Sequence, residues 1–425
     1  MIKNFIKGKE KNFLVIGTLV FLAGLTKLLG FVRNAVLAYF FGTSHSADMF
    51  SLLLYPTELI LSFVVNNTII TALTSFYGRS DTAKEKVFWK VIHFYEAALV
   101  AIAIVIVILM SFTYTGVNPV YLLIGAVAAI LYGLSGIIQS FLNYKLKFYS
   151  SAFQDLASQL LLILGIGVAH FWGVGSFAIF MLAASIARIL VQIPDLKKTL
   201  DTKISLKNIL PKSLPFDREI MRYILPLVFS FFLSNIPSFI ILAQLQRTGS
   251  GYIAAYNYAV KIITLFNPIV IIPFTTYVIP KLQNMLEKRE EKIVGRIHAI
   301  ALLIITMTSS IAAAVFWFLS EPIAKILYFR GNFGGDALAL TSSMLQWLSF
   351  TVIGYAVMYY LLQLVLMHKQ NRLVLTCYVV GTIVAVAILF LNIEPINIRI
   401  AASLTLGTFV SIIILLSDAL KRISK

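Results

Sequence analysis

Two basic residues lie inside the first apolar segment of the chain. Lys27 and Arg33 follow a run of apolar or small residues that begins at Phe13. A helix rises about 1.5 Å per residue, so Lys27 lies roughly 20 Å above Phe13, within the hydrocarbon of a bilayer. A cation at that depth costs about 2.5 to 3.5 kcal/mol and is normally kept only where it faces a partner or a water-filled cavity. The two residues therefore indicate an anion-binding cavity or an internal ion pair.

Two acidic residues on the next apolar segment could compensate these cations. Asp48 follows the break Gly42-Thr43-Ser44, and Glu58 lies ten residues further on. Either carboxylate could fold back to Lys27 or to Arg33, so the pairing stays open, and we predict gating or ion-pair roles for both acids. Arg33, roughly 30 Å up a straight helix, could instead extend to the outer interface.

A third basic residue, Lys261, interrupts an apolar segment in the second half of the chain. It lies roughly 14 Å into the segment 251–280, and Asn267 and Pro268 follow it with a polar group and a bend. A mid-membrane lysine beside broken backbone is a candidate for ligand binding or gating. The alternative is an ion pair with Glu58 or Asp48 that locks the two halves together.

Arg188 completes the predicted substrate-binding set, with Lys27, Arg33 and Lys261. It lies about 13 residues into its segment, near enough to the inner face for its side chain to reach water. Lining a cavity and lying at the interface are equally open for it. Asp155, near the end of its own helix, is expected to be solvated.

The composition predicts an all-α polytopic membrane protein. Of 425 residues 59% are hydrophobic and only 12% charged, with a mean hydropathy of +0.90, whereas about a quarter of the residues of a soluble domain are charged. The single Cys377 excludes an intramolecular disulfide framework. We predict about twelve membrane spans, at residues 13–41, 46–76, 87–113, 118–144, 150–171, 175–196, 220–245, 251–280, 294–319, 337–367, 372–393 and 398–419.

The basic residues are unequally divided between the two sides of these spans. The tails and the even-numbered loops hold 27 of the 35 Lys and Arg residues, and the odd-numbered loops hold four. The positive-inside rule then places both termini on the cytoplasmic side of the membrane. This placement accounts for the net charge of +17 without a nucleic-acid partner.

A basic connector divides the spans into two groups of six. Residues 197–219 form the longest polar stretch and contain prolines. We therefore predict an N-terminal lobe at 1–196, a cytoplasmic linker at 197–219 and a C-terminal lobe at 220–425, as in transporters whose lobes rock about a central site.

Signatures of catalysis and of metal or nucleotide binding are missing from the sequence. It contains no phosphate-binding glycine loop and no His, Cys and Asp cluster at metal-ligand spacing. The longest outer loop, 320–336, holds only Glu321 and Asp336 as acids. We expect a transporter rather than an enzyme, with no cofactor and no metal.

Several motifs resemble one known family. Thr26-Lys27-Leu28-Leu29-Gly30-Phe31-Val32-Arg33-Asn34, followed by Ala47-Asp48-Met49-Phe50, is similar to the signature of the MurJ (MviN) lipid II flippases. Met221-Arg222, Tyr258-Ala259-Val260-Lys261 and Tyr328-Phe329-Arg330-Gly331-Asn332-Phe333 resemble that family in the same order.

This resemblance implies a member of the multidrug/oligosaccharidyl-lipid/polysaccharide (MOP) exporter superfamily, with two lobes in a V-shaped bundle. Such a protein moves an undecaprenyl-diphosphate-linked saccharide, lipid II or a similar molecule, to the outer leaflet by alternating access. The resemblance places Lys27, Arg33, Asp48 and Lys261 at functional positions. The expected partners are this substrate, membrane lipids and envelope-synthesis proteins, and the chain is expected to be a monomer.

The chain also departs from that family. Lysine replaces arginine at positions 27 and 261, which keeps the charge but loses the bidentate guanidinium. Twelve spans rather than the family's usual fourteen are expected of Wzx-type flippases for O-antigen, capsule or exopolysaccharide units, which remain an alternative. A MATE-like drug or cation exporter is a weaker one, because its cavity should be rich in carboxylates.

Overall fold

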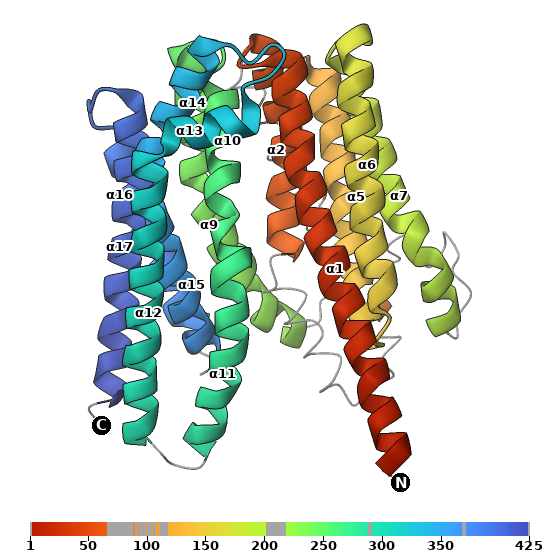
Figure 1. The fold of residues 1–425 in the computed structure, drawn as a ribbon, viewed down its shortest axis with the longest axis vertical. Coiled ribbons are helices and arrows are strands. Elements are labelled where there is room, and N and C mark those ends of the chain that lie inside the picture. Colours follow the sequence, from red (N-terminus) through yellow and green to blue (C-terminus); the bar gives the residue numbers. More distant parts are fainter. Residues whose placement is uncertain are drawn as a thin grey trace. The chain divides into compact units, whose positions relative to one another are not determined.

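The computed structural model is helical throughout the part of the chain that it describes. It describes residues 2–65, 118–200, 218–287, 291–367 and 371–423, together with isolated positions between 88 and 110. Every regular element within these ranges is a helix (Figure 1). The predicted all-α class is confirmed.

The helix bounds follow the predicted spans closely. The first half contains α1 (Ile2–Phe41), α2 (His45–Val65), α5 (Pro119–Tyr144), α6 (Phe148–Trp172) and α7 (Gly175–Thr199). The second contains α9 (Arg218–Thr248), α10 (Tyr252–Thr264), the π-helix η1 (Asn267–Ile271), α11 (Ile272–Glu287), α12 (Glu291–Phe318), α13 (Ser320–Tyr328), α14 (Gly335–Leu348), α15 (Thr351–Met367), α16 (Asn371–Leu389) and α17 (Ile396–Ile423).

Seven of the described helical segments are long and apolar enough to cross a membrane, and an eighth is obtained if the bent pair of α14 and α15 counts as one span. Most residues of the predicted span 87–113 and most of the predicted linker, 201–217, lie outside the described residues. Both therefore stay predictions.

The chain forms two compact units. The first contains Met1–Phe41 and Met49–Ile224, and the second contains Gly42–Asp48 and Leu225–Lys425. The segment Gly42–Asp48, which we name the crossover turn, thus belongs to the second unit although it joins two helices of the N-terminal half. The lobe boundaries predicted from the sequence do not assign the crossover turn to the second unit.

Helices α5, α6 and α7 pack together in the first unit, and α1 packs on α6. Pro119 is the first residue of α5, where its missing N–H removes no helical bond, and the Asn118 side chain accepts a hydrogen bond from the Val120 N–H at 2.9 Å. Gly165 lies so close to Phe180 that a Cβ would stand 2.5 Å from the Phe180 Cβ. Small residues thus allow the close helix contact that is common in membranes.

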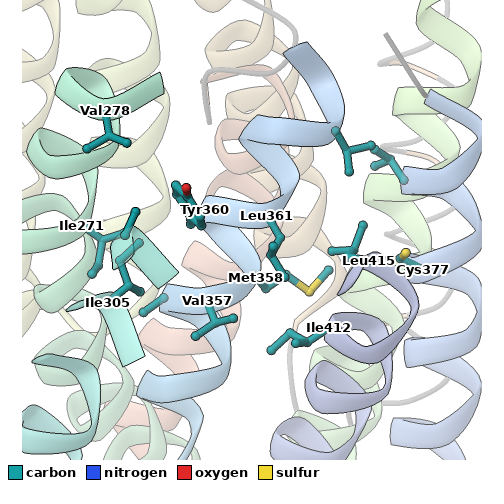
Figure 2. Close-up of a cluster of buried hydrophobic side chains, with 14 of the residues drawn as sticks. Ile271, Val278, Ile305, Val357, Met358, Tyr360, Leu361, Cys377, Ile412 and Leu415 are labelled. Carbon is teal, nitrogen blue, oxygen red and sulfur yellow. The ribbon is translucent and has the colours of Figure 1, made fainter. Parts of the chain in front are cut away.

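An apolar core joins η1, α11, α12, α15, α16 and α17 in the second unit. Figure 2 shows Ile271, Val278, Ile305, Leu361 and Leu415 among its side chains. Helices α16 and α17 approach most closely at two glycines, since a Cβ on Gly407 would lie 2.7 Å from the Gly381 carbonyl oxygen.

One face of α12 carries large apolar side chains that the protein leaves exposed. Ile300, Leu303, Met307 and Ile311 recur every three or four residues and are each at least half exposed. Such a stripe fits a helix that faces lipid.

Candidate functional site

Arg33 and Glu58 form an ion pair between α1 and α2 in the first unit. The Arg33 Nη2 donates to the Glu58 Oε1 at 2.9 Å. Arg33 is 6% exposed, and its buried Nε has no hydrogen-bond partner. Of the two carboxylates that the sequence left open for Arg33, the structure pairs it with Glu58. Its guanidinium is therefore held by a carboxylate and keeps one donor unused.

Lys27 lies six residues before Arg33 on the same helix, about 9 Å along its axis. Its side chain is exposed, and it makes no hydrogen bond or ion pair with the residues that the structure describes. Glu58 of the same unit is paired with Arg33. The role of Lys27 in substrate binding stays a prediction.

Asp48 of the crossover turn caps the N-terminus of α10. Its Oδ2 accepts from the Gly251 N–H at 2.6 Å and its Oδ1 from the Ala254 N–H at 2.8 Å, and the residue is 5% exposed. The partners that the structure gives Asp48 are backbone amides of its own unit, and an ion pair with Lys27 or Arg33 of the first unit stays a prediction. The carboxylate satisfies two helix-end amides and lies at the positive end of the helix dipole.

Two glycines allow the crossover turn to lie close to the end of α10 and to the segment between α13 and α14. Gly251 has φ +87°, and a Cβ there would lie 2.0 Å from the Thr43 carbonyl oxygen. Gly42 has φ +56°, and a Cβ there would lie 2.4 Å from the Asn332 carbonyl oxygen. Both positions need a glycine for its conformation and its size.

Buried aromatic residues hold the crossover turn from the other side. The Tyr258 hydroxyl donates to the Gly42 carbonyl oxygen at 2.9 Å, and the Tyr328 hydroxyl donates to the Tyr258 carbonyl oxygen at 3.4 Å. The Tyr258 and Tyr328 ring centroids lie 5.0 Å apart, and Phe333 packs against both rings. Burial raises the pKa of Tyr328, so its hydroxyl stays protonated as a donor. The loop motif at 328–333 is thus part of the support of the crossover turn.

Lys261 lies on the same helix, one turn after Tyr258. Its side chain is half-buried, and the π-helix η1 begins six residues later. Lys27 and Arg33 belong to the first unit and Lys261 to the second. Their convergence on one substrate stays a prediction.

Arg188 is buried inside the first unit rather than placed at an interface. It is 1% exposed, its Nη1 forms an ion pair with the Asp155 Oδ1, and its Nε donates to the Ser135 Oγ at 3.0 Å. Its guanidinium also lies over the Tyr132 ring, 4.7 Å from the centroid. Asp155, expected to be solvated, is the partner that compensates this cation. Direct contact between Arg188 and a substrate would require this network to open.

Gln192 and Gln154 extend this network, and the sequence analysis did not include them. Gln192 donates to the Ser135 carbonyl oxygen at 3.1 Å and to the Gln154 side chain. Gln154 in turn donates to the Gln139 Oε1 at 2.9 Å. The spacing of the residues could have indicated the role of Gln192, because Arg188 and Gln192 are four residues apart and share one face of α7.

The described residues contain no group of three or more His, Cys, Asp or Glu side chains able to hold a metal ion. The predicted site residues include the exposed Lys27, Arg33 paired with Glu58, and Asp48 at the end of α10.

The fold is shared with two classes of transporter. A solved structure of the lipid II flippase MurJ in an inward closed conformation is 18% identical, with a TM-score of 0.76, and the match covers 95% of this chain and 87% of that one. An inward-facing multidrug resistance MATE family transporter of the MOP superfamily is 14% identical, with a TM-score of 0.75 and 94% of each chain covered. The Vibrio cholerae MATE transporter VcmN in its bent form is 13% identical, with a TM-score of 0.56, covering 96% of this chain and 98% of that one. The chain therefore has the MOP-exporter fold.

A family comparison gives the narrower assignment. The family described as "Lipid II flippase MurJ" matches residues 37–425, and the chain belongs to it. The matched range begins after Lys27 and Arg33, so the substrate-binding role predicted for these two residues rests on the sequence motif and on their positions in α1. A search of curated proteins finds no match.

Proposed function

We propose that this protein moves a polyprenyl-diphosphate-linked saccharide, lipid II or a close relative, from the inner to the outer leaflet of a bacterial cytoplasmic membrane. Membership of the MurJ family is the observation that carries the proposal. The basic residues of α1 support it, since charge-assisted hydrogen bonds to phosphate are strong where water is excluded. The positive-inside orientation, with both termini cytoplasmic, is part of the proposal.

Arg33 exchanges its partner during binding in this proposal. Its Nε has no hydrogen-bond partner, and Glu58, with a side chain 34% exposed, is bonded to Nη2. A diphosphate that approaches the exposed Lys27 ammonium adds acceptors for the unused donor. Lys27 and Arg33 then bind the head group from the first unit, while Lys261 contributes from the second.

The crossover turn acts as the gate in the same proposal. Asp48 holds the end of α10 through two buried bonds, and Tyr258 holds the Gly42 carbonyl. Release of these bonds frees the helix that carries Lys261. In alternating access, the protein then captures the substrate while the crossover turn is bonded to α10 and releases the substrate after these bonds have opened.

The membrane potential is a sufficient source of energy for this cycle. Moving one elementary charge through 100 mV is worth about 2.3 kcal/mol, so an outward-moving dianion gains up to about 4.6 kcal/mol in an inside-negative cell.

Identification of the bound lipid tests the proposal. The protein is purified in mild detergent from its native membrane, and co-purified lipids are identified by mass spectrometry. A polyprenyl diphosphate that carries a muropeptide is expected. A peptide-free oligosaccharide would transfer the assignment to Wzx-type export of polysaccharide units, and recovery of bulk phospholipid alone would contradict the proposal.

A further inference from the structure

Two membrane-crossing helices of the second unit are interrupted. Helix α10 ends at Thr264 and passes through the π-helix η1 into α11. Helix α14 ends at Leu348, and α15 begins at Thr351 with its axis bent by 45°. In Figure 1 the labels α10 and α14 lie together at one end of the unit, and α11 and α15 lie toward the other.

The first interruption has a defined chemical cause. Pro268 has no N–H, so the usual hydrogen bond to the carbonyl four residues earlier cannot form there, and the helix widens into a π-turn. The Thr275 hydroxyl lies 2.9 Å from both the Ile271 and the Ile272 carbonyl oxygens. A buried side chain thus supplies a donor next to the widened turn.

The second interruption is also stabilised by buried hydroxyl groups. The Ser349 Oγ donates to the Gln346 carbonyl oxygen at 2.7 Å, and the Thr351 Oγ1 donates to the Leu348 carbonyl oxygen at 2.6 Å. Ser349 is fully buried, and Thr351 is 2% exposed. Buried polar groups of this kind indicate a bend that the sequence specifies.

The two interrupted helices pack against each other segment by segment. Helix α10 packs on α14, whereas η1 and α11 pack on α15. We name α10 and α14 the capping pair, and α11 and α15 the core pair.

Only the core pair belongs to the apolar cluster of Figure 2. That cluster takes its buried residues from η1, α11, α12, α15, α16 and α17. Ile271, the last residue of η1, is its member nearest to the first interruption. Tyr258 of α10 instead packs on Tyr328 of α13, and the capping pair carries the end of α10 that Asp48 caps. Helices α12 and α17 pack on α14 as well as on α15, so the two pairs share these neighbours and differ in the rest of their packing.

We propose that the interruptions at 265–271 and 349–350 form one paired hinge inside the second unit. Bending at the hinge moves the capping pair, Lys261 and the Asp48-capped end of α10 as a single body relative to the core pair. Asn267, Pro268, Ser349 and Thr351 are then positioning residues, which act on the ligand through Lys261. This inference rests on the proposed transport function and adds a movable segment within one unit.

Distances between spin labels within the second unit test the hinge. One label replaces exposed Ala339 on α14, ten residues before Ser349, and the other replaces exposed Ile413 on α17. A lever of ten residues is about 15 Å long, so a rotation of about 20° moves its end by about 5 Å. We expect the distance distribution of the full-length protein to shift by about that amount when a purified polyprenyl-diphosphate saccharide is added.

A matched label pair at Ile311 of α12 and Ile383 of α16 serves as the control, because both residues are exposed on uninterrupted helices. Its distribution is expected to stay unchanged. Equal shifts in both pairs, or no shift in the first pair under conditions where the wild-type protein transports the saccharide, would overturn the hinge. Wild-type protein that neither binds nor transports the saccharide would instead refute the proposed function.

Substitutions at the interruptions give an independent measurement. Pro268→Ala restores the missing N–H and should reduce transport about tenfold and abolish the ligand-induced shift. Ser349→Ala should act in the same direction, whereas Ser349→Thr keeps the hydroxyl and should retain transport. Ser309→Ala is the control, since buried Ser309 on uninterrupted α12 donates to the Ile305 carbonyl oxygen at 2.7 Å. Wild-type transport and an unchanged ligand-induced shift in folded Pro268→Ala would contradict the hinge.

Discussion

Removal of the Asp48 carboxylate should loosen the first turn of α10. Asp48→Ala leaves the N–H groups of Gly251 and Ala254 without their acceptors, and both bonds are buried. An unsatisfied buried donor costs about 1 to 3 kcal/mol, and loss of a helix N-cap costs about 0.5 to 2 kcal/mol. Because the two amides share one acceptor group and water can reach an opened helix end, we take about 2 kcal/mol for the pair. That free energy corresponds to a roughly 30-fold larger population of the opened turn.

Hydrogen–deuterium exchange measures this population directly. The amides of residues 249–256 should exchange roughly 30-fold faster in Asp48→Ala than in the wild type. Asp336→Ala is the matched control, because Asp336 also lies in the first turn of a helix of the same unit but is exposed, and the α14 N-terminus has no side-chain cap. Unchanged exchange at 249–256 in folded Asp48→Ala would refute the capping role. Equal acceleration in both variants would show a general loss of stability instead.

Three further substitutions test other parts of the structure. Arg188→Met should lower the free energy of unfolding by about 3 kcal/mol, measured by thermal unfolding in detergent. This value is at the lower end for a broken buried ion pair because the Asp155 side chain is 29% exposed. Arg188→Met combined with Asp155→Leu should recover most of that loss, and a double variant less stable than Arg188→Met would contradict the pairing. Tyr258→Phe removes the bond to the Gly42 carbonyl oxygen, worth about 1 kcal/mol, and should accelerate amide exchange at 249–256 roughly fivefold. Tyr328→Phe removes a 3.4 Å bond and should have a smaller effect, so the reverse order would contradict the geometry.

The helical class and most span bounds could be predicted because membrane crossing leaves a strong signal in composition. A bilayer requires about 20 consecutive apolar residues for each helix, and each such run is visible in the sequence. The short helix α13 was not predicted, since nine residues outside the bilayer leave no such signal.

The partners of the charged groups could be predicted only in part. Depth along a helix identified Lys27, Arg33 and Lys261 as residues that need compensation. Depth does not determine which carboxylate turns toward which cation, so the Arg33–Glu58 pair stayed one of several options. The capping role of Asp48 was not visible because its partners are backbone amides, which every residue except proline carries.

The two helix interruptions illustrate the same limit. Pro268 predicted a bend in its helix, and the structure has a π-helix at this position. The bend between α14 and α15 contains no proline or glycine. Ser349 and Thr351 stabilise it through their hydroxyl groups. The sequence could not predict this role, because hydroxyl groups inside a membrane protein can also bond to other helices.

A translocation assay on a charge-neutral variant tests the central claim most directly. Purified protein is placed in vesicles that contain a fluorescent polyprenyl-diphosphate saccharide, and the appearance of its head group on the opposite leaflet is timed. We predict transport by the wild type, and none by Lys27→Gln combined with Lys261→Gln, although that variant should insert and unfold like the wild type. Full transport by the double variant would contradict the cationic binding site on which the account depends.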